Sequence, residues 1–296
     1  MNAVRLPGGR RFFLLRFASL CGAAAALWLT ACAAAPEHEV NERDAVAQIL
    51  SLLPADAILL GEQHDAPAHH RIEAGAVAAL AARGELAALA LEMADQGRST
   101  RALATGASEA QVKQALGWNE AGWPWHDYAG AVMAAVRAGV PVVGANLPRE
   151  QMKDAMANAA LDDRLTAAVL FEQQQAIREG HCDLLPESQI APMTRIQIAR
   201  DQAMARTVEA ASVPGRTVLL IAGVGHVRRD LGIPLHFSPK IKKKVVIALV
   251  QRSSDAANKI ATEASLPAGT ADLSIRTAAP PPKDHCAELR SAMQRR

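Results

Sequence analysis

The sequence predicts an α/β protein: a parallel-type central sheet flanked by helices, with a helical insertion between the third and fourth strands. Three observations lead to this prediction. The chain has 296 residues, of which 50% are hydrophobic and 21% charged, enough apolar material for a sizeable core. Short apolar runs alternate with stretches of helical periodicity, which is typical of a parallel sheet. Two helix-length stretches in succession separate the third apolar run from the fourth.

The predicted strands are short apolar runs without alternating polar residues, as buried parallel strands require. They span residues 57–60, 86–91, 140–144, 217–222 and 245–250, with a further strand expected at 272–276. Asp65 and Pro67 mark a helix start and Gly84 marks its end. Another helix is expected after Asp127, and the two long helices of the insertion are expected at 161–180 and 187–211.

The first 31 residues have the pattern of a secretory signal peptide. A basic segment ending at Arg16 precedes an apolar stretch that is shorter than the roughly 20 residues of a membrane-spanning helix, and small residues precede Cys32. The alternative is a buried N-terminal helix. The pattern resembles bacterial lipoproteins, with lipid on Cys32 and, because Ala33 follows it, sorting to the outer membrane. The expected divisions are a signal peptide (1–31), a lipidated tether (32–42), a folded domain (43–286) and a tail (287–296).

Charge is uneven along the chain. The signal segment holds four arginines and no acidic residue, whereas the remainder holds 28 basic and 30 acidic residues. A nucleic-acid-binding domain is expected to carry a basic surplus, so we predict no nucleic-acid partner. Removal of the signal peptide and lipidation of Cys32 leave Cys182 and Cys286. In an oxidising envelope these two predict a disulfide, and two free thiols are the alternative.

Polar groups follow the first four predicted strands. Because ligands bind at the carboxyl ends of the strands in open parallel sheets, we expect these groups to converge on one site. They are Glu62, His64, Glu92, Asn146 and His226. Helix capping or pairing with arginine is the alternative role for each acidic residue. Glutamate and histidine also bind divalent metals, so Glu62, His64, Glu92 and His226 form a candidate metal set.

Aromatic residues are rare, at 3% of the chain, and four of them lie between residues 118 and 128. Trp118, Trp123, Trp125 and Tyr128 predict either an apolar wall for a flat ligand or a small core within a bent loop. Tyr128 is the only tyrosine, and a phenolate is a suitable ligand for ferric haem iron. We expect His126 or a nearby arginine to lower its pKa. His69 and His70 are interpreted as solvated surface residues.

Several ordered motifs resemble the ChaN family of haem-binding lipoproteins, in the Tiki and erythromycin-esterase-like superfamily. They are Gly61-Glu62-Gln63-His64-Asp65, Leu91-Glu92-Met93, Trp123-Pro124-Trp125 to Tyr128, Gly144-Ala145-Asn146-Leu147-Pro148-Arg149, His181-Cys182, Arg200-Asp201 to Ala205, and Ile221 to Pro234. The resemblance implies an α/β fold, a membrane anchor, and haem bound at a homodimer interface.

The resemblance also implies specific roles. The tyrosine on iron can only be Tyr128, while His64, His181 and His226 are the candidate histidines near the propionates and Arg149 and Arg200 the candidate arginines. The expected function is haem and iron acquisition at the outer membrane, with an outer-membrane haem receptor as partner. Relatives that are metal-dependent hydrolases suggest an alternative, in which the Glu62, His64, Glu92 and His226 set holds a divalent metal. A purely structural lipoprotein would leave the polar strand ends unexplained.

Overall fold

The computed structural model describes residues 41–251, 266–278, 280–281 and 283–294. The predicted signal peptide, Cys32 and nearly all of the predicted tether lie outside the described residues. Within the described part of the chain, no helix is both long and apolar enough to cross a membrane.

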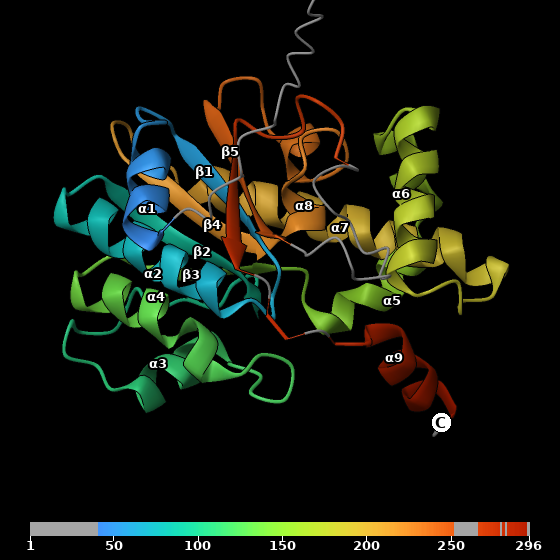
Figure 1. Ribbon diagram of the computed structural model, residues 1–296, viewed down its shortest axis with the longest axis horizontal. Coiled ribbons are helices and arrows are strands. Elements are labelled where there is room, and N and C mark those ends of the chain that lie inside the picture. Colours follow the sequence, from blue (N-terminus) through green and yellow to red (C-terminus); the bar gives the residue numbers. More distant parts are fainter. Residues whose placement is uncertain (1–40, 252–265, 279, 282, 295–296) are drawn as a thin grey trace, which may run out of the picture. The chain divides into compact units, whose positions relative to one another are not determined.

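The centre of the fold is a sheet of six strands that all run parallel, in the order β3-β2-β4-β1-β5-β6. The strands are β1 (Ala57–Glu62), β2 (Leu86–Asp95), β3 (Val142–Asn146), β4 (Thr217–Gly223), β5 (Lys243–Gln251) and β6 (Leu273–Ala278). This confirms the predicted fold class (Figure 1). Because β1 lies between β4 and β5, its carboxyl end is near the middle of the sheet.

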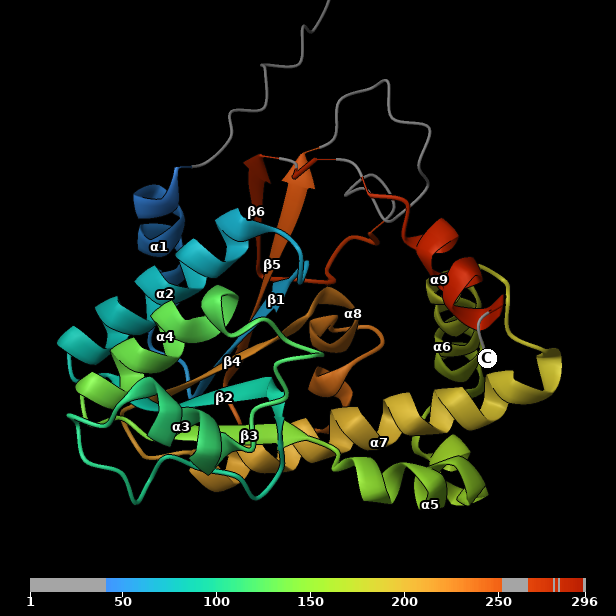
Figure 2. The ribbon, with the colours of Figure 1, turned by 90° about the horizontal axis from the view of Figure 1, so that it is seen from below.

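Helices cover both faces of the sheet. On one face lie α1 (Glu42–Leu50), α2 (Pro67–Ala82), α3 (Glu109–Leu116) and α4 (Trp125–Arg137). The other face is covered by α7 (Glu187–Ala211) and the short α8 (Val224–Val227). Figure 2 shows α2 and α4 on the opposite side of the sheet from α7.

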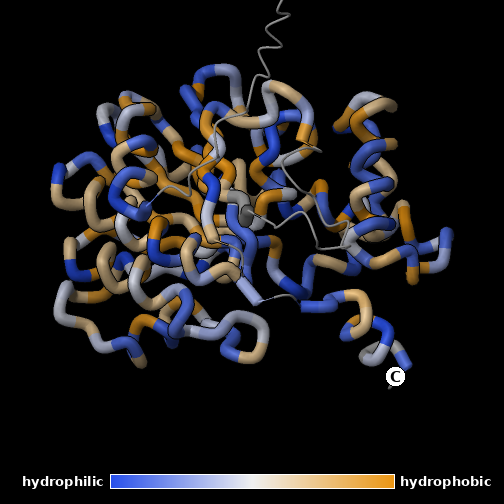
Figure 3. The backbone as a smooth tube through the Cα atoms, viewed as in Figure 1, coloured by the Kyte–Doolittle hydropathy of each residue, from blue (hydrophilic) through white to orange (hydrophobic). Residues whose placement is uncertain are grey.

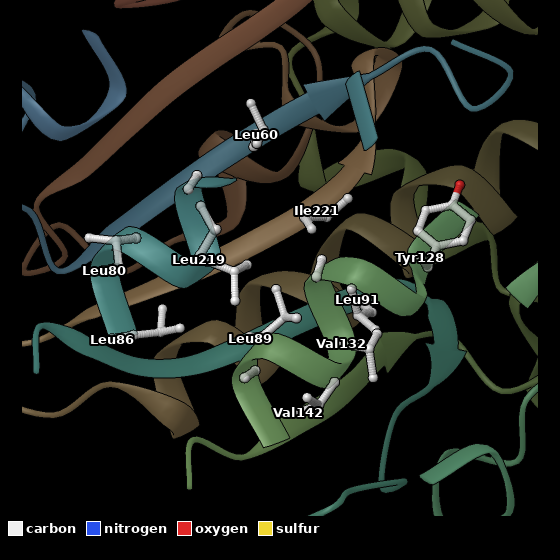
Figure 4. Close-up of a cluster of buried hydrophobic side chains, with 14 of the residues drawn as sticks. Leu60, Leu80, Leu86, Leu89, Leu91, Tyr128, Val132, Val142, Leu219 and Ile221 are labelled. Atoms are coloured by element: carbon white, nitrogen blue, oxygen red, sulfur yellow. The ribbon is translucent and has the colours of Figure 1, made fainter. Parts of the chain in front are cut away.

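Alternate residues of each strand enter two separate cores. Ile58 and Leu60 of β1 pack with α2 and α4, whereas Leu59 packs with α7 and β5. All three are buried, so both faces are apolar, and hydrophobic colours are concentrated in the central strands (Figure 3). In the first core, Tyr128 lies at one end of a row of aliphatic side chains that includes Leu91 and Val132 (Figure 4).

The helical insertion between β3 and β4 differs in detail from its prediction. It contains α5 (Met152–Ala157), the 3₁₀ turn at Ala159–Arg164, α6 (Ala167–Gly180) and α7. The helix expected at 161–180 therefore begins only at Ala167. The reason is local, since the Thr166 side chain accepts a hydrogen bond from the Val169 N–H and caps a new helix.

The C-terminal residues include a final helix, α9 (His285–Gln294), where the sequence indicated a weakly specified tail. A disulfide joins Cys286 of α9 to Cys182, which follows α6. A second contact anchors α9, as His285 Nε2 lies 3.1 Å from the Asp65 carboxylate after β1. Both links hold the end of the chain on the domain.

Candidate functional site

The polar groups that follow the strands converge at the carboxyl edge of the sheet, as the sequence predicted. Glu62 ends β1, Glu92 lies in β2, and His226 lies in α8 directly after β4. Glu92 Oε2 accepts a hydrogen bond from the Gly223 N–H at 2.8 Å, which ties β2 to the end of β4. His64 follows β1 and lies between Glu62 and Glu92.

Glu62 is the centre of the first group of contacts. Its Oε1 accepts hydrogen bonds from the Tyr128 hydroxyl at 2.9 Å and from His64 Nδ1 at 2.8 Å. Its Oε2 lies 3.1 Å from His70 Nε2. Burial would raise the pKa of Glu62, but the hydrogen bond from His64 and the close approach of His70 outweigh it and hold that pKa far below the usual range. Glu62 is therefore an anion inside the protein.

His226 is the centre of the second group. Its Nδ1 donates to Asp201 Oδ1 at 2.5 Å, and its Nε2 lies 3.3 Å from Glu92 Oε1. Burial would lower the pKa of His226, but the two carboxylates raise it to about 10, so the imidazole carries a positive charge. Burial raises the pKa of Asp201 to about 6, whereas His226 and the Gly223 N–H bring that of Glu92 down to about 2 despite its burial.

His64 connects the two groups and is their accessible member. Its side chain is 37% exposed, and its Nε2 lies 3.9 Å from Glu92 Oε2. Burial acts to lower its pKa, but the hydrogen bond to Glu62 and the charge of Glu92 raise it above its ordinary value. A Cβ at Gly223 would lie 2.8 Å from His64 Nε2, so glycine at this position makes room for the imidazole.

The aromatic residues form one packed group around Tyr128. Trp118 meets Trp125 edge-on with ring centroids 5.0 Å apart, and Trp123 lies 6.2 Å from Tyr128. Trp125 is buried, whereas Trp118 and Trp123 are half-buried. Trp123 also contacts the His64 ring, at 4.8 Å. The group therefore serves as a small core and presents an apolar surface next to His64.

Tyr128 is buried, and its hydroxyl is engaged within the protein. Its side chain is only 1% exposed, and its hydroxyl donates to Glu62. Burial and the neighbouring carboxylates of Glu62 and Glu73 raise the pKa of Tyr128 far above its ordinary value. The expectation of a lowered pKa was therefore wrong, because His126 is highly exposed and faces Asp127.

The interpretation of His69 and His70 as surface residues was also wrong, since both are buried. His69 Nδ1 accepts from the Gln63 N–H and its Nε2 lies 3.0 Å from Thr277 Oγ1, so it joins the end of β1 to β6. Burial lowers the pKa of His69 to about 4, which keeps the ring neutral. His70 points the other way, toward Glu62.

The four residues of the candidate metal set can be located in the structure. Glu62, His64, Glu92 and His226 are brought together, but as a chain of paired charges. Among the described residues, the one group whose ligand atoms all lie within 4.8 Å of one another is Glu62, His70 and Glu73. Sequence reasoning missed His70 and Glu73 as site residues, although their spacing of three places them on one face of α2.

The remaining candidates lie in different places. Arg149 follows β3 at the carboxyl edge and is exposed, while Arg200 is half-buried on α7 with its guanidinium 4.0 Å from Met152 Sδ. Asn146 ends β3 and is buried. His181 lies at the end of α6, where its Nδ1 bonds to the Ile177 carbonyl, and so belongs to the helical insertion. Asp201, which holds His226, was not among the predicted site residues.

Comparisons with known proteins agree with this fold. The sequence profile of a family described as "Haem-binding uptake, Tiki superfamily, ChaN" matches residues 49–237, more than half of the chain. The solved structure of Campylobacter jejuni ChaN, described as showing cofacial heme binding, is similar with a TM-score of 0.58 and 27% identity. That match covers 68% of this chain and 84% of the Campylobacter chain.

Two further solved structures are less similar. The type III effector HopBA1 has 15% identity and a TM-score of 0.43 over 83% of this chain and 96% of its own. An erythromycin esterase EreC mutant has 13% identity and a TM-score of 0.43 over 72% of this chain and 74% of its own. A comparison with curated protein sequences finds no match.

The profile match over more than half of the chain, on an all-parallel α/β fold, defines the class as that of the haem-binding uptake proteins. Within that class, the chain belongs to the ChaN family of the Tiki superfamily.

Proposed function

We propose that this protein binds ferric haem at the carboxyl edge of its sheet, with His64 as the contact to iron. The observation that carries the proposal is the pairing of His64 and Trp123, a partly exposed imidazole beside a half-buried indole. Haem is a flat apolar ring around an iron atom. The imidazole is a ligand for the iron, and the indole is an apolar surface for the ring. Family membership and the cofacial heme binding of the Campylobacter relative support the same ligand.

The resemblance suggests Tyr128 as the iron ligand, but Tyr128 would have to move before it could bind iron. The tyrosine oxygen would have to leave Glu62 and reach the surface past Trp123, at the cost of breaking a buried hydrogen bond. His64 would also have to turn, because its Nδ1 donates to Glu62 and its Nε2 lies against Gly223, but its side chain is already partly exposed. Ligation of iron by Tyr128 is therefore the alternative, and variants of Tyr128 and His64 distinguish the two.

Haem also carries two propionates, which need cations or hydrogen-bond donors. Arg149 is exposed and follows β3 at the same edge of the sheet, so it is the residue that we assign to this role. Arg200 is less accessible, and His181 lies in the helical insertion.

We further propose that the protein is a lipoprotein, anchored through Cys32 at the outer membrane of a bacterial envelope. The basic segment, the apolar stretch and the small residues before Cys32 support this anchor. Its role would be haem and iron acquisition in concert with an outer-membrane haem receptor. Cofacial heme binding in the Campylobacter relative supports homodimer formation when haem binds.

A titration of the full-length chain with haemin, followed by visible absorption, tests the proposal. We expect saturable binding at a fixed stoichiometry, weakened in Trp123→Ala and unchanged in His126→Ala, a neighbouring exposed residue. Sedimentation of the saturated sample tests the dimer. Weak binding that never saturates, and is equal in all three proteins, would contradict haem binding.

A second candidate, a metal-dependent hydrolase, is favoured by one observation. His64 is accessible and lies between the ionised carboxylates of Glu62 and Glu92, a suitable position for proton transfer. Turnover of an ester or peptide that is lost in the Glu62→Gln and His64→Gln variants would support this candidate.

A further inference from the structure

Glu73 is a buried carboxylate that neither haem binding nor hydrolysis at His64 uses. It lies on the second turn of α2 and is 1% exposed, and both of its oxygens lack a hydrogen-bond partner among the residues that the structure describes. Burying a carboxyl group with no partner costs several kcal/mol, because water is removed and nothing replaces it. The position of Glu73 therefore indicates a bound group that would interact with its two carboxyl oxygens.

Two further unsatisfied atoms face Glu73. Glu62 Oε2 and His70 Nε2 lie 3.1 Å apart, but without hydrogen-bond geometry, so neither atom has a hydrogen-bond partner in the described part of the chain. One ligand atom from each of Glu62, His70 and Glu73 lies within 4.8 Å of the other two. Ligands on a tetrahedral divalent metal lie about 3.4 Å apart, so small side-chain rotations would close this group around an ion.

The surroundings of His70 match those of a metal-binding histidine. Its Nε2 faces the two glutamates, while its Nδ1 lies 3.7 Å from the Asp127 carboxylate. Metal-bound histidines commonly direct their second nitrogen at a carboxylate, which orients the ring and makes it a stronger ligand. Asp127 and Tyr128 both come from α4, and Tyr128 holds the other oxygen of Glu62.

We propose that Glu62, His70 and Glu73 bind one divalent first-row transition metal, such as Zn²⁺ or Mn²⁺, in a site distinct from the haem surface. One imidazole and two carboxylates suit such ions. The three ligands are buried, so the metal joins the start of α2 to the end of β1. It also fixes Glu62, and through Glu62 the positions of Tyr128 and His64. This inference does not depend on the proposed haem binding.

The test uses the full-length chain, freed of metal with a chelator and titrated with Co²⁺ in the absence of haem. We expect one Co²⁺ per chain with visible ligand-field bands. Glu73→Gln and His70→Gln should abolish the bands, and Asp127→Asn should weaken binding about 10–100-fold. His181→Gln, a change in the helical insertion, should bind as the unchanged protein does.

Three results would overturn the proposal. The first is the absence of stoichiometric Co²⁺, which would mean that Glu73 and Glu62 share only a proton. The second is Co²⁺ binding by Glu73→Gln that equals that of the unchanged protein. The third is loss of Co²⁺ binding in His226→Gln while Glu73→Gln retains it. If a variant fails to fold, X-ray absorption of the Co²⁺-loaded unchanged protein counts the imidazole ligands on the metal. One imidazole supports the proposed site, and two or more contradict it.

Discussion

The Tyr128 hydroxyl donates to Glu62 Oε1 at 2.9 Å, and this contact links the aromatic group to the charged edge of the sheet. Glu62 would be poorly solvated without it, because the carboxylate is buried at the end of a central strand. The only tyrosine of the chain therefore acts in this structure as a donor to a buried anion. His64 donates to the same oxygen, but its side chain is 37% exposed.

Replacement of Tyr128 with phenylalanine tests this contact. Tyr128→Phe keeps the ring packing and removes one hydrogen bond to a charged group, so we expect a loss of about 1.5–3 kcal/mol in the free energy of unfolding. Urea unfolding measures the change, with His126→Ala as a control at an exposed site. A variant as stable as the unchanged protein would show that Glu62 does not depend on the hydroxyl.

The pairing of His226 with Asp201 and Glu92 predicts a dependence of stability on alkaline pH. The folded pKa of His226 is raised from 6.5 to about 10, so its stabilising contribution is full below pH 6.5. Unfolded chains lose the proton first as the pH rises, and the contribution falls until it is lost above about pH 10. We therefore expect the melting temperature to decrease between pH 6.5 and 10.

The His226→Gln variant is the matched comparison for this prediction. It lacks the titrating ring, so its melting temperature should fall less steeply over that pH range while being lower at pH 6.5. Parallel curves for the two proteins would contradict the assignment of the alkaline effect to His226.

The disulfide between Cys182 and Cys286 closes a loop with a sequence separation of 104 residues and holds α9 on the domain. The double change Cys182→Ser with Cys286→Ser should lower the free energy of unfolding by about 2–4 kcal/mol, since the unfolded chain gains freedom. Denaturant unfolding measures this loss. Mass mapping under non-reducing conditions should find the two cysteines linked, and two alkylatable thiols would contradict the link.

Gly223 predicts a selective effect on the site. Gly223→Ala places a methyl group 2.8 Å from His64 Nε2, and His64 is exposed enough to rotate away. We expect roughly tenfold weaker haemin binding, about 1.4 kcal/mol, with little change in melting temperature. Gly225→Ala is the matched control, because no atom of the described residues lies within 4 Å of its Cβ position. Equal haemin affinity in the Gly223→Ala and Gly225→Ala variants would contradict a contact between His64 and haem.

The strands could be predicted because their sequence pattern is simple. Each is a short apolar run such as 57–60, and burial on both faces of a parallel sheet removes the need for polar alternation. The polar group after each strand then indicated the functional edge. The start of α6 was predicted too early because the side chain of Thr166 caps a new helix inside a stretch of continuous helical periodicity.

The site could be predicted only in part. Glu62 and Glu92 follow from their places at strand ends, but the partners of His70 and His226 depend on how α2 and α7 pack. Asp201 lies in the middle of a 25-residue helix, so nothing in its local sequence distinguishes it from a surface acid. The role of Tyr128 on iron, implied by the family resemblance and by its being the only tyrosine, stays a prediction, and its burial against Glu62 depends on tertiary packing that composition does not reveal.

The identity of the iron ligand tests the central claim most directly. Haemin titrations of the unchanged chain, His64→Ala and Tyr128→Phe, followed by visible absorption, distinguish the two residues. We predict that His64→Ala abolishes the saturable haem spectrum, whereas Tyr128→Phe retains it at the same stoichiometry. Loss of the spectrum in Tyr128→Phe with retention in His64→Ala would contradict this account and assign the iron to the tyrosine.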